Sequence, residues 1–115
     1  MRRALLLLVV AAVAGCGPAA PFRLAVEQGG GSRRFRLIAA PGVRINARLK
    51  PALELEDGTV LRFDSPHVAE QGAYFADAPA LETAPPRALH RGVVRASVCA
   101  TAEQICESFT LAVRF

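Results

Sequence analysis

The three cysteines of this 115-residue chain are the residues whose chemistry is most informative. Cys99 and Cys106 lie close together near the C-terminus, and Cys16 follows an apolar N-terminal run. Two neighbouring cysteines can form a disulfide that serves only as a cross-link. They can also take part in thiol–disulfide exchange, in which a thiolate attacks one sulfur and releases the other. The sequence around each cysteine decides which of these roles is open to it.

Residues 1–15 are typical of a cleaved export leader. Arg2 and Arg3 precede an unbroken apolar run of 11 residues, 4–14, which is too short for a membrane-spanning helix of about 20 residues. The run ends in Val13-Ala14-Gly15-Cys16, which resembles the bacterial lipobox, where the cysteine thiol receives a diacylglyceryl group. We therefore expect a lipoprotein signal peptide over residues 1–15, a lipidated Cys16, and a short tether within residues 16–21. Two or more acyl chains would anchor the protein stably to a membrane.

This leader predicts the cell envelope as the location, with the domain on the periplasmic side. In Gram-negative bacteria an Asp after the lipidated cysteine typically retains a lipoprotein in the inner membrane. Gly17 occupies that position here, which weakly favours the outer membrane. An exported location permits disulfides. With Cys16 acylated, Cys99 and Cys106 remain as an even pair.

Length and charge limit the number of domains and the kinds of partner that the mature protein can have. Removing 15 of 115 residues leaves 100, enough for one small domain. The formal net charge of +4 includes Arg2 and Arg3, so the mature part carries 12 − 10 = +2. Nucleic-acid binding requires a concentrated basic surface, and we therefore expect no nucleic-acid partner.

The two histidines do not suggest a metal centre. His90 would lie about 30 Å from Cys99 along an extended strand, so a site with Cys99 and Cys106 would need a sharp bend. His67 is interpreted as a solvated loop residue. We expect no metal and no other cofactor.

The elements that position the cysteine pair are predicted to be short strands. Apolar and polar residues alternate with a period of two in several segments, and no segment has a sustained period of 3.6. Turn residues separate the segments, among them the glycine run 29–31 and the pair Asp57-Gly58. Residues 64–72 are expected to form a loop. The pattern predicts an all-β, immunoglobulin-like antiparallel β-sandwich of about 7–8 short strands over residues 22–115.

Residues 92–115 are expected to form a hairpin with a loop near residues 101–104. If Cys99 lies opposite Cys106, Ser97 faces Ser108 and Ala96 faces Phe109, so polar residues meet polar ones and apolar residues meet apolar ones. Directly opposed positions bring Cβ atoms close enough for a bridge. We therefore predict a Cys99–Cys106 disulfide. Alternation places both cysteines on the polar face, away from the core.

The energetics of this bridge leave its role open. The closed loop has about 8 residues, so the entropic stabilisation is at most about 2.5 kcal/mol. A weak cross-link on an exposed face would be open to attacking thiolates. However, structural disulfides are common in hairpins of exported sandwiches, and spacing alone favours a structural role.

The region 93–115 resembles the N-terminal domain of DsbD-type thiol:disulfide interchange proteins, which carries a cysteine pair on such a hairpin. Residues 42–46 (GVRIN) and 50–55 (KPALEL) resemble that family's early segment. The likeness extends over roughly residues 22–115. It implies an immunoglobulin-like sandwich in which Cys99 and Cys106 pass electrons between a membrane component and periplasmic thioredoxin-like partners.

Two functions are therefore expected. The first is a membrane-anchored envelope lipoprotein that exchanges disulfides through Cys99 and Cys106 with periplasmic thioredoxin-like or other envelope proteins. The alternative is a non-catalytic structural or protein-interaction lipoprotein whose disulfide is a cross-link. The sequence does not indicate which cysteine a partner thiolate would attack.

Overall fold

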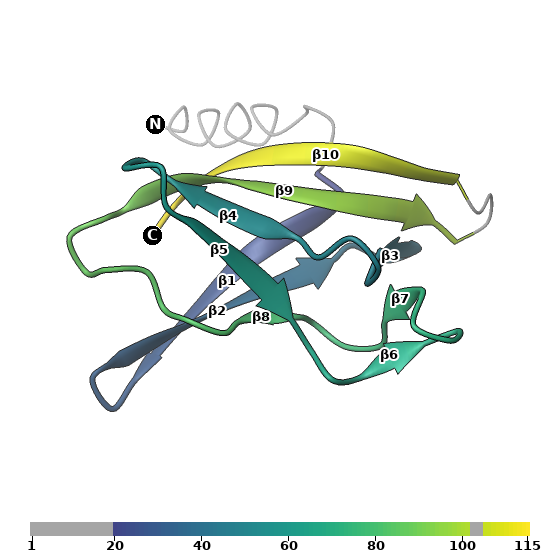
Figure 1. The fold of residues 1–115 in the computed structure, drawn as a ribbon, viewed down its shortest axis with the longest axis horizontal. Coiled ribbons are helices and arrows are strands. Elements are labelled where there is room, and N and C mark those ends of the chain that lie inside the picture. Colours follow the sequence, from purple (N-terminus) through teal and green to yellow (C-terminus); the bar gives the residue numbers. More distant parts are fainter. Residues whose placement is uncertain (1–19, 102–104) are drawn as a thin grey trace, which may run out of the picture.

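The computed structural model describes residues 20–101 and 105–115. The expected signal peptide, Cys16 and tether residues 17–19 lie outside the described residues, as do residues 102–104 of the expected C-terminal loop. The described chain forms ten strands and no helix (Figure 1). In chain order the strands are β1 (Phe22–Gly29), β2 (Ser32–Ala39), β3 (Val43–Ile45), β4 (Ala52–Leu55), β5 (Val60–Asp64), β6 (Val68–Ala69), β7 (Tyr74–Phe75), β8 (Ala80–Leu81), β9 (Arg91–Ala100) and β10 (Ile105–Arg114).

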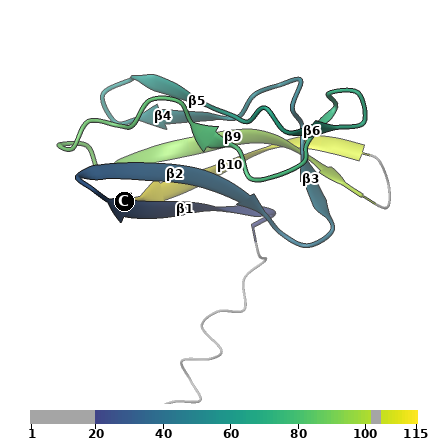
Figure 2. The same cartoon turned by 90° about the horizontal axis from the view of Figure 1, so that it is seen from below.

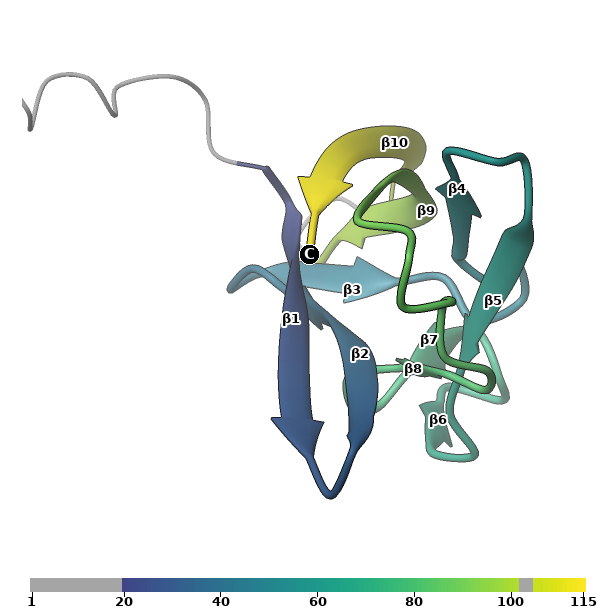
Figure 3. The same ribbon diagram turned by 90° about the vertical axis from the view of Figure 1, so that its left-hand side faces the viewer.

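The strands form one large antiparallel sheet and one small one. The large sheet has the order β1-β2-β8-β5-β4-β9-β10, and β3 also pairs with β9. Strands β6 and β7 pair with each other in the second sheet. Viewed along the strands, the large sheet curls so that β1 and β2 face β9 and β10 (Figure 3), and the same two layers are visible from below (Figure 2).

The curl encloses the hydrophobic core. Two edge-to-face aromatic pairs join the facing layers, Phe22 with Phe109 at 5.5 Å between ring centroids and Phe35 with Phe115 at 4.8 Å. Edge-to-face geometry suits the charge distribution of aromatic rings. Other core side chains come from the inward positions of the central strands and include Leu37, Leu53, Phe63 and Val94. The expected all-β antiparallel sandwich is confirmed.

Two predicted turns are also confirmed. Gly30 and Gly31 connect β1 to β2 with φ angles of 58° and 83°, which cost glycine no steric strain. Gly58, with φ of 93°, ends the turn between β4 and β5, and its N–H donates to the Leu55 carbonyl at 2.9 Å. These turns set the register of the two hairpins.

The prediction that residues 64–72 form a loop is wrong in one part. Val68 pairs with Phe75 and Ala69 with Tyr74, so the β6–β7 hairpin occupies the end of that segment. Glu70, Gln71 and Gly72 make its turn, with φ angles of 52°, 60° and 86°. Strands of two residues are too short to show an alternating pattern, which is why the sequence did not reveal this hairpin.

Candidate functional site

The cysteine hairpin has the register predicted from its side-chain pattern. Cys99 on β9 lies directly opposite Cys106 on β10, with Ser97 opposite Ser108 and Ala96 opposite Phe109. The two sulfur atoms are 2.11 Å apart and the Cα atoms 3.9 Å apart. The pair is at disulfide-bonding distance, and the predicted pairing is confirmed.

The expected exposure of both cysteines is wrong. Cys106 is exposed on the edge strand β10, whereas Cys99 is completely buried, with 0% of its surface accessible. The cause is β3, which pairs with β9 beside the cysteine, Val43 opposite Ala100 and Ile45 opposite Val98. Cys99 therefore lies between two neighbouring strands, β3 and β10, whereas Cys106 on the edge strand has a neighbouring strand on one side only. An external thiolate has direct access to one half of the disulfide.

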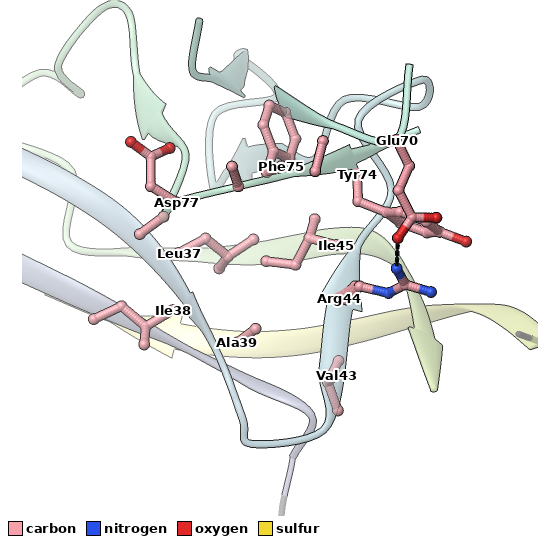
Figure 4. Close-up of a pocket in the computed structure, with 13 residues that line it drawn as sticks. Leu37, Ile38, Ala39, Val43, Arg44, Ile45, Glu70, Tyr74, Phe75 and Asp77 are labelled. Atoms are coloured by element: carbon pink, nitrogen blue, oxygen red, sulfur yellow. Dashed lines mark hydrogen bonds and ion pairs between the residues drawn. The ribbon is translucent and has the colours of Figure 1, made fainter. Parts of the chain in front are cut away.

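A positive side chain occupies the position opposite Cys99 on β3. Arg44 is the cross-strand partner of Cys99, and directly opposed side chains on one face have Cβ atoms about 5 Å apart. The guanidinium carbon of Arg44 lies 3.8 Å from the centre of the Tyr74 ring, and the guanidinium forms an ion pair with Glu70 (Figure 4). The Arg44 Nε is buried and has no hydrogen-bond acceptor among the described residues.

Arg44 is a cationic neighbour of Cys99 across the β3–β9 pair. A nearby guanidinium stabilises a thiolate over a thiol, and a stabilised thiolate leaves a disulfide more readily. Glu70, which lies in the turn of the β6–β7 hairpin, forms the ion pair with Arg44 and neutralises part of its charge. Tyr74 and Glu70 of the β6–β7 hairpin therefore hold the guanidinium of the residue that pairs with Cys99.

A hollow of about 520 Å³ lies behind the same hairpin. Its apolar lining includes Leu37, Ile45 and Phe75, and Arg44, Glu70 and Tyr74 lie at one side of it (Figure 4). Phe75 is buried in the core whereas Tyr74 is half-buried. One aromatic ring thus fixes the hairpin to the core, and the other supports the arginine.

His67 belongs to a separate polar cluster. Its Nδ1 lies 2.7 Å from Asp77 Oδ2, and the Ser65 hydroxyl donates to Asp77 Oδ1 at 2.6 Å. The hydroxyl of Ser65 and the ring of His67 both hold the pKa of Asp77 below its ordinary value. The Ser65 hydroxyl is directed at the Asp77 carboxylate and not at the His67 imidazole. The cluster therefore lacks the serine–histidine contact that activates a nucleophile. It joins the segment before β6 to the segment after β7.

His90 lies at the opposite end of β9 from Cys99. Its Nδ1 is 3.1 Å from the Phe115 carbonyl oxygen, and its backbone N–H donates to Glu56 Oε2 at 3.1 Å. Within residues 20–101 and 105–115, no group of three or more His, Cys, Asp or Glu side chains is placed to hold a metal ion.

Arg44 and Tyr74 were not identified as site residues from the sequence. Alternation along β3 did place Arg44 on the face opposite Val43 and Ile45, but its partner strand lies more than 50 residues further along the chain. Only the non-sequential pairing of β3 with β9 brings Arg44 to Cys99.

Comparison with known protein families, with curated proteins and with solved structures gives no match to this chain. Among the described residues, no helix is both long and apolar enough to cross a bilayer. Fold and site together define the class to which the chain belongs. It is an all-β sandwich with a cross-strand cysteine pair, one member exposed and the other buried opposite an arginine.

Proposed function

We propose that the protein is a lipid-anchored envelope protein that exchanges disulfides with periplasmic thioredoxin-like or other envelope thiol proteins through Cys99 and Cys106. The observation that carries this proposal is the unequal exposure of the pair. A bridge that served only as a cross-link would gain nothing from one accessible cysteine and one buried opposite Arg44. The resemblance of residues 93–115 to the N-terminal domain of DsbD-type interchange proteins supports the same function.

The burial of Cys99 assigns the order of the steps. A thiolate of a reduced partner attacks Sγ of Cys106, a mixed disulfide forms, and the Cys99 sulfur leaves as a thiolate opposite Arg44. A second thiolate of the partner then attacks the partner's own sulfur in the mixed disulfide and releases the Cys106 thiolate. The partner loses two electrons and becomes a disulfide, and the protein gains them as a dithiol.

The reduced protein passes these electrons on by the reverse sequence. The Cys106 thiolate attacks a disulfide of the next protein and forms a mixed disulfide. The Cys99 thiolate then attacks Sγ of Cys106, which restores the intramolecular bridge and releases the other protein as a dithiol.

Single-cysteine variants test the assignment. We expect Cys99→Ala, which leaves the accessible cysteine free, to accumulate mixed disulfides with envelope proteins on non-reducing gels. The matched variant Cys106→Ala should accumulate few, because its remaining thiol is buried. Equal trapping by both variants would contradict the order of steps, and no adduct with either variant would contradict exchange altogether.

The competing function is a structural or protein-interaction module with a cross-linking disulfide. The observation that favours it is the length of the β9–β10 ladder, which pairs ten residues on each strand and orders the hairpin without the bridge. The reduction potential of the pair separates the two functions. Below about −300 mV the bridge would be structural, whereas a value between about −270 and −120 mV would support exchange.

A further inference from the structure

A basic groove lies next to the cysteine pair on the same face of the sheet. It has a volume of about 560 Å³ and lies between the segment that joins β3 to β4 and the strands β5, β4, β9 and β10. Four cationic side chains line it, Arg48, Lys50, Arg62 and Arg95. No Asp or Glu is among the described residues that line it. We call this feature the basic groove.

The register explains why a hollow forms between these charges. Ala52 on β4 lies between Arg62 on β5 and Arg95 on β9 in one cross-strand row. Neighbouring strands are about 4.8 Å apart, so the two arginine backbones are about 10 Å apart with only a methyl group between them. An extended chain could lie in this space with a guanidinium on each side.

The positive charge of the basic groove is only partly neutralised within the protein. Lys50 forms an ion pair with Asp64 at 2.8 Å, and Arg95 forms one with Glu54 at 3.3 Å. Arg48 and Arg62 are exposed and have no ion-pair partner among the described residues. Two guanidinium groups are therefore free to bind carboxylates from outside, in the planar bidentate geometry that arginine favours.

One end of the basic groove lies near the disulfide. Ser97 and Ser108 line its end and face each other across β9 and β10, two residues along each strand from Cys99 and Cys106. Two residues of strand span about 7 Å. A chain bound in the groove would therefore place a cysteine at its end within reach of the exposed Cys106.

We propose that the basic groove is the docking site for an extended, acidic segment of the thiol protein that exchanges with Cys106. The inference rests on the proposed function, because it assigns the partner chemistry at the same disulfide. Complementary charge steers association and selects partners more than it adds raw affinity. A peptide is favoured over a membrane surface because the groove is a concave channel floored by Ala52 and hydroxyl side chains, and because a protein thiol must occupy its end.

Binding of a charged peptide to the full-length protein in neutral detergent tests the proposal. The probe is a fluorescein-labelled decapeptide of alternating Glu and Ala, compared by anisotropy with the same peptide carrying Gln in place of Glu. The test variant is Arg48→Glu with Arg62→Glu. The matched control is Arg23→Glu with Arg114→Glu, two exposed arginines outside the groove that also have no ion-pair partner among the described residues.

We expect the Glu peptide to bind at least about tenfold more tightly than the Gln peptide at low salt and to weaken as salt is raised. The groove variant should lose that preference, and the control should keep it to within about threefold. Equal losses in both variants would mean that overall charge attracts the peptide and would overturn the proposal. So would equal binding of the two peptides, or groove-dependent binding to phosphatidylglycerol vesicles but not to the Glu peptide.

The binding measurement needs no redox chemistry, so it separates the two proposals. Groove-dependent binding without mixed-disulfide trapping in Cys99→Ala would leave the docking site standing and contradict exchange. Trapping without a preference for the Glu peptide would leave exchange standing and overturn the acidic docking segment.

Discussion

At the scale of single residues, the two halves of the disulfide have different surroundings. Cys106 is on an edge strand and exposed, whereas β3 covers Cys99 and places Arg44 opposite it. In the proposed exchange, a positive charge near the Cys99 sulfur would stabilise the thiolate that leaves. We therefore propose Arg44 as a positioning residue for that reaction, since it would act through Cys99 and not on the partner.

Replacing Arg44 with Gln should slow the exchange reaction by about threefold to tenfold, because the Cys99 thiolate loses its counter-charge. The rate of reduction by dithiothreitol, followed by the loss of the disulfide, measures this effect. Arg44→Lys should retain most of the rate, since it retains the charge. If Gln and Lys variants react at the wild-type rate, the arginine has only a structural contact with Tyr74.

The cluster around Asp77 predicts a pH dependence. The pKa of Asp77 is lowered by the Ser65 hydroxyl and by His67, so the folded state binds the proton less well than the unfolded state. The stabilisation is therefore complete above the ordinary carboxyl pKa of about 4 and is lost as the pH falls through the lower folded pKa. Because the Asp77 side chain is 49% exposed, the effect is small.

We expect Asp77→Asn to lower the melting temperature by about 1–3 °C at pH 6 and to differ less from wild type at pH 2.5. Thermal melts across this range provide the measurement. Glu107→Gln is the control, because Glu107 is an exposed acid with no ion pair among the described residues. A constant difference between Asp77→Asn and wild type at both pH values would show that the charge of Asp77 contributes nothing.

At the scale of elements, β9 organises both the core and the site. On one side it pairs with β10 along its whole length, and on the other it pairs with β4 in its first half and with β3 at its end. Its inward residues Val94 and Ala96 belong to the core, whereas Arg95 and Ser97 line the basic groove and Cys99 carries the bridge. A shift of β9 against its neighbours would therefore disturb every functional feature together.

At Gly92, β9 leaves no room for a side chain against β4. A Cβ atom at this position would lie 2.7 Å from the Glu54 carbonyl oxygen and 2.9 Å from Leu53 Cδ1, so backbone would have to move. We expect Gly92→Ala to destabilise the domain by about 1–3 kcal/mol and to lower its melting temperature by about 10 °C. Gly29→Ala is the matched control, since nothing lies within 4 Å of its added Cβ. A melting temperature for Gly92→Ala equal to that of the control would disprove the close approach.

At the scale of the whole molecule, the curl of the sheet brings the start of the described chain to the cysteine pair. Pro21 lines a small cavity together with Cys99 and Ile105. The residues between Cys16 and Phe22 span at most about 17 Å when fully extended. A lipid on Cys16 would therefore hold the exposed Cys106 close to the membrane, within reach of membrane-bound thiol partners.

Cys16→Ala tests the anchor. The Cys16 thiol is the proposed acceptor of the lipid, so we expect the variant to leave the membrane fraction and to carry no fatty acid after metabolic labelling. Cys106→Ala serves as the control and should remain membrane-bound. If Cys16→Ala stays in the membrane fraction without label, the lipoprotein proposal is wrong.

Much of the fold follows from local pattern. Alternation in residues 92–115, with Cys99 placed opposite Cys106, predicted the β9–β10 register that the structure has, because polar residues then face polar ones and apolar residues face apolar ones. The glycines at positions 30, 31 and 58 marked turns that need positive φ. Strand β6 and its pairing with β7 could not be predicted, because a two-residue strand has no periodic pattern.

The sequence by itself determined the all-β class, the pairing of Cys99 with Cys106 and the register of the two strands that carry them. These features depend on side-chain alternation and turn residues, which act between neighbours in the chain. Only the tertiary structure decided that Cys99 is buried, that Arg44 lies opposite it, and that a basic groove lies near the bridge. Those features arise where β3 and β4 pair with β9, a strand far from both in the sequence, and where β5 pairs with β4. Such contacts depend on how the whole sheet closes, and no local pattern encodes that.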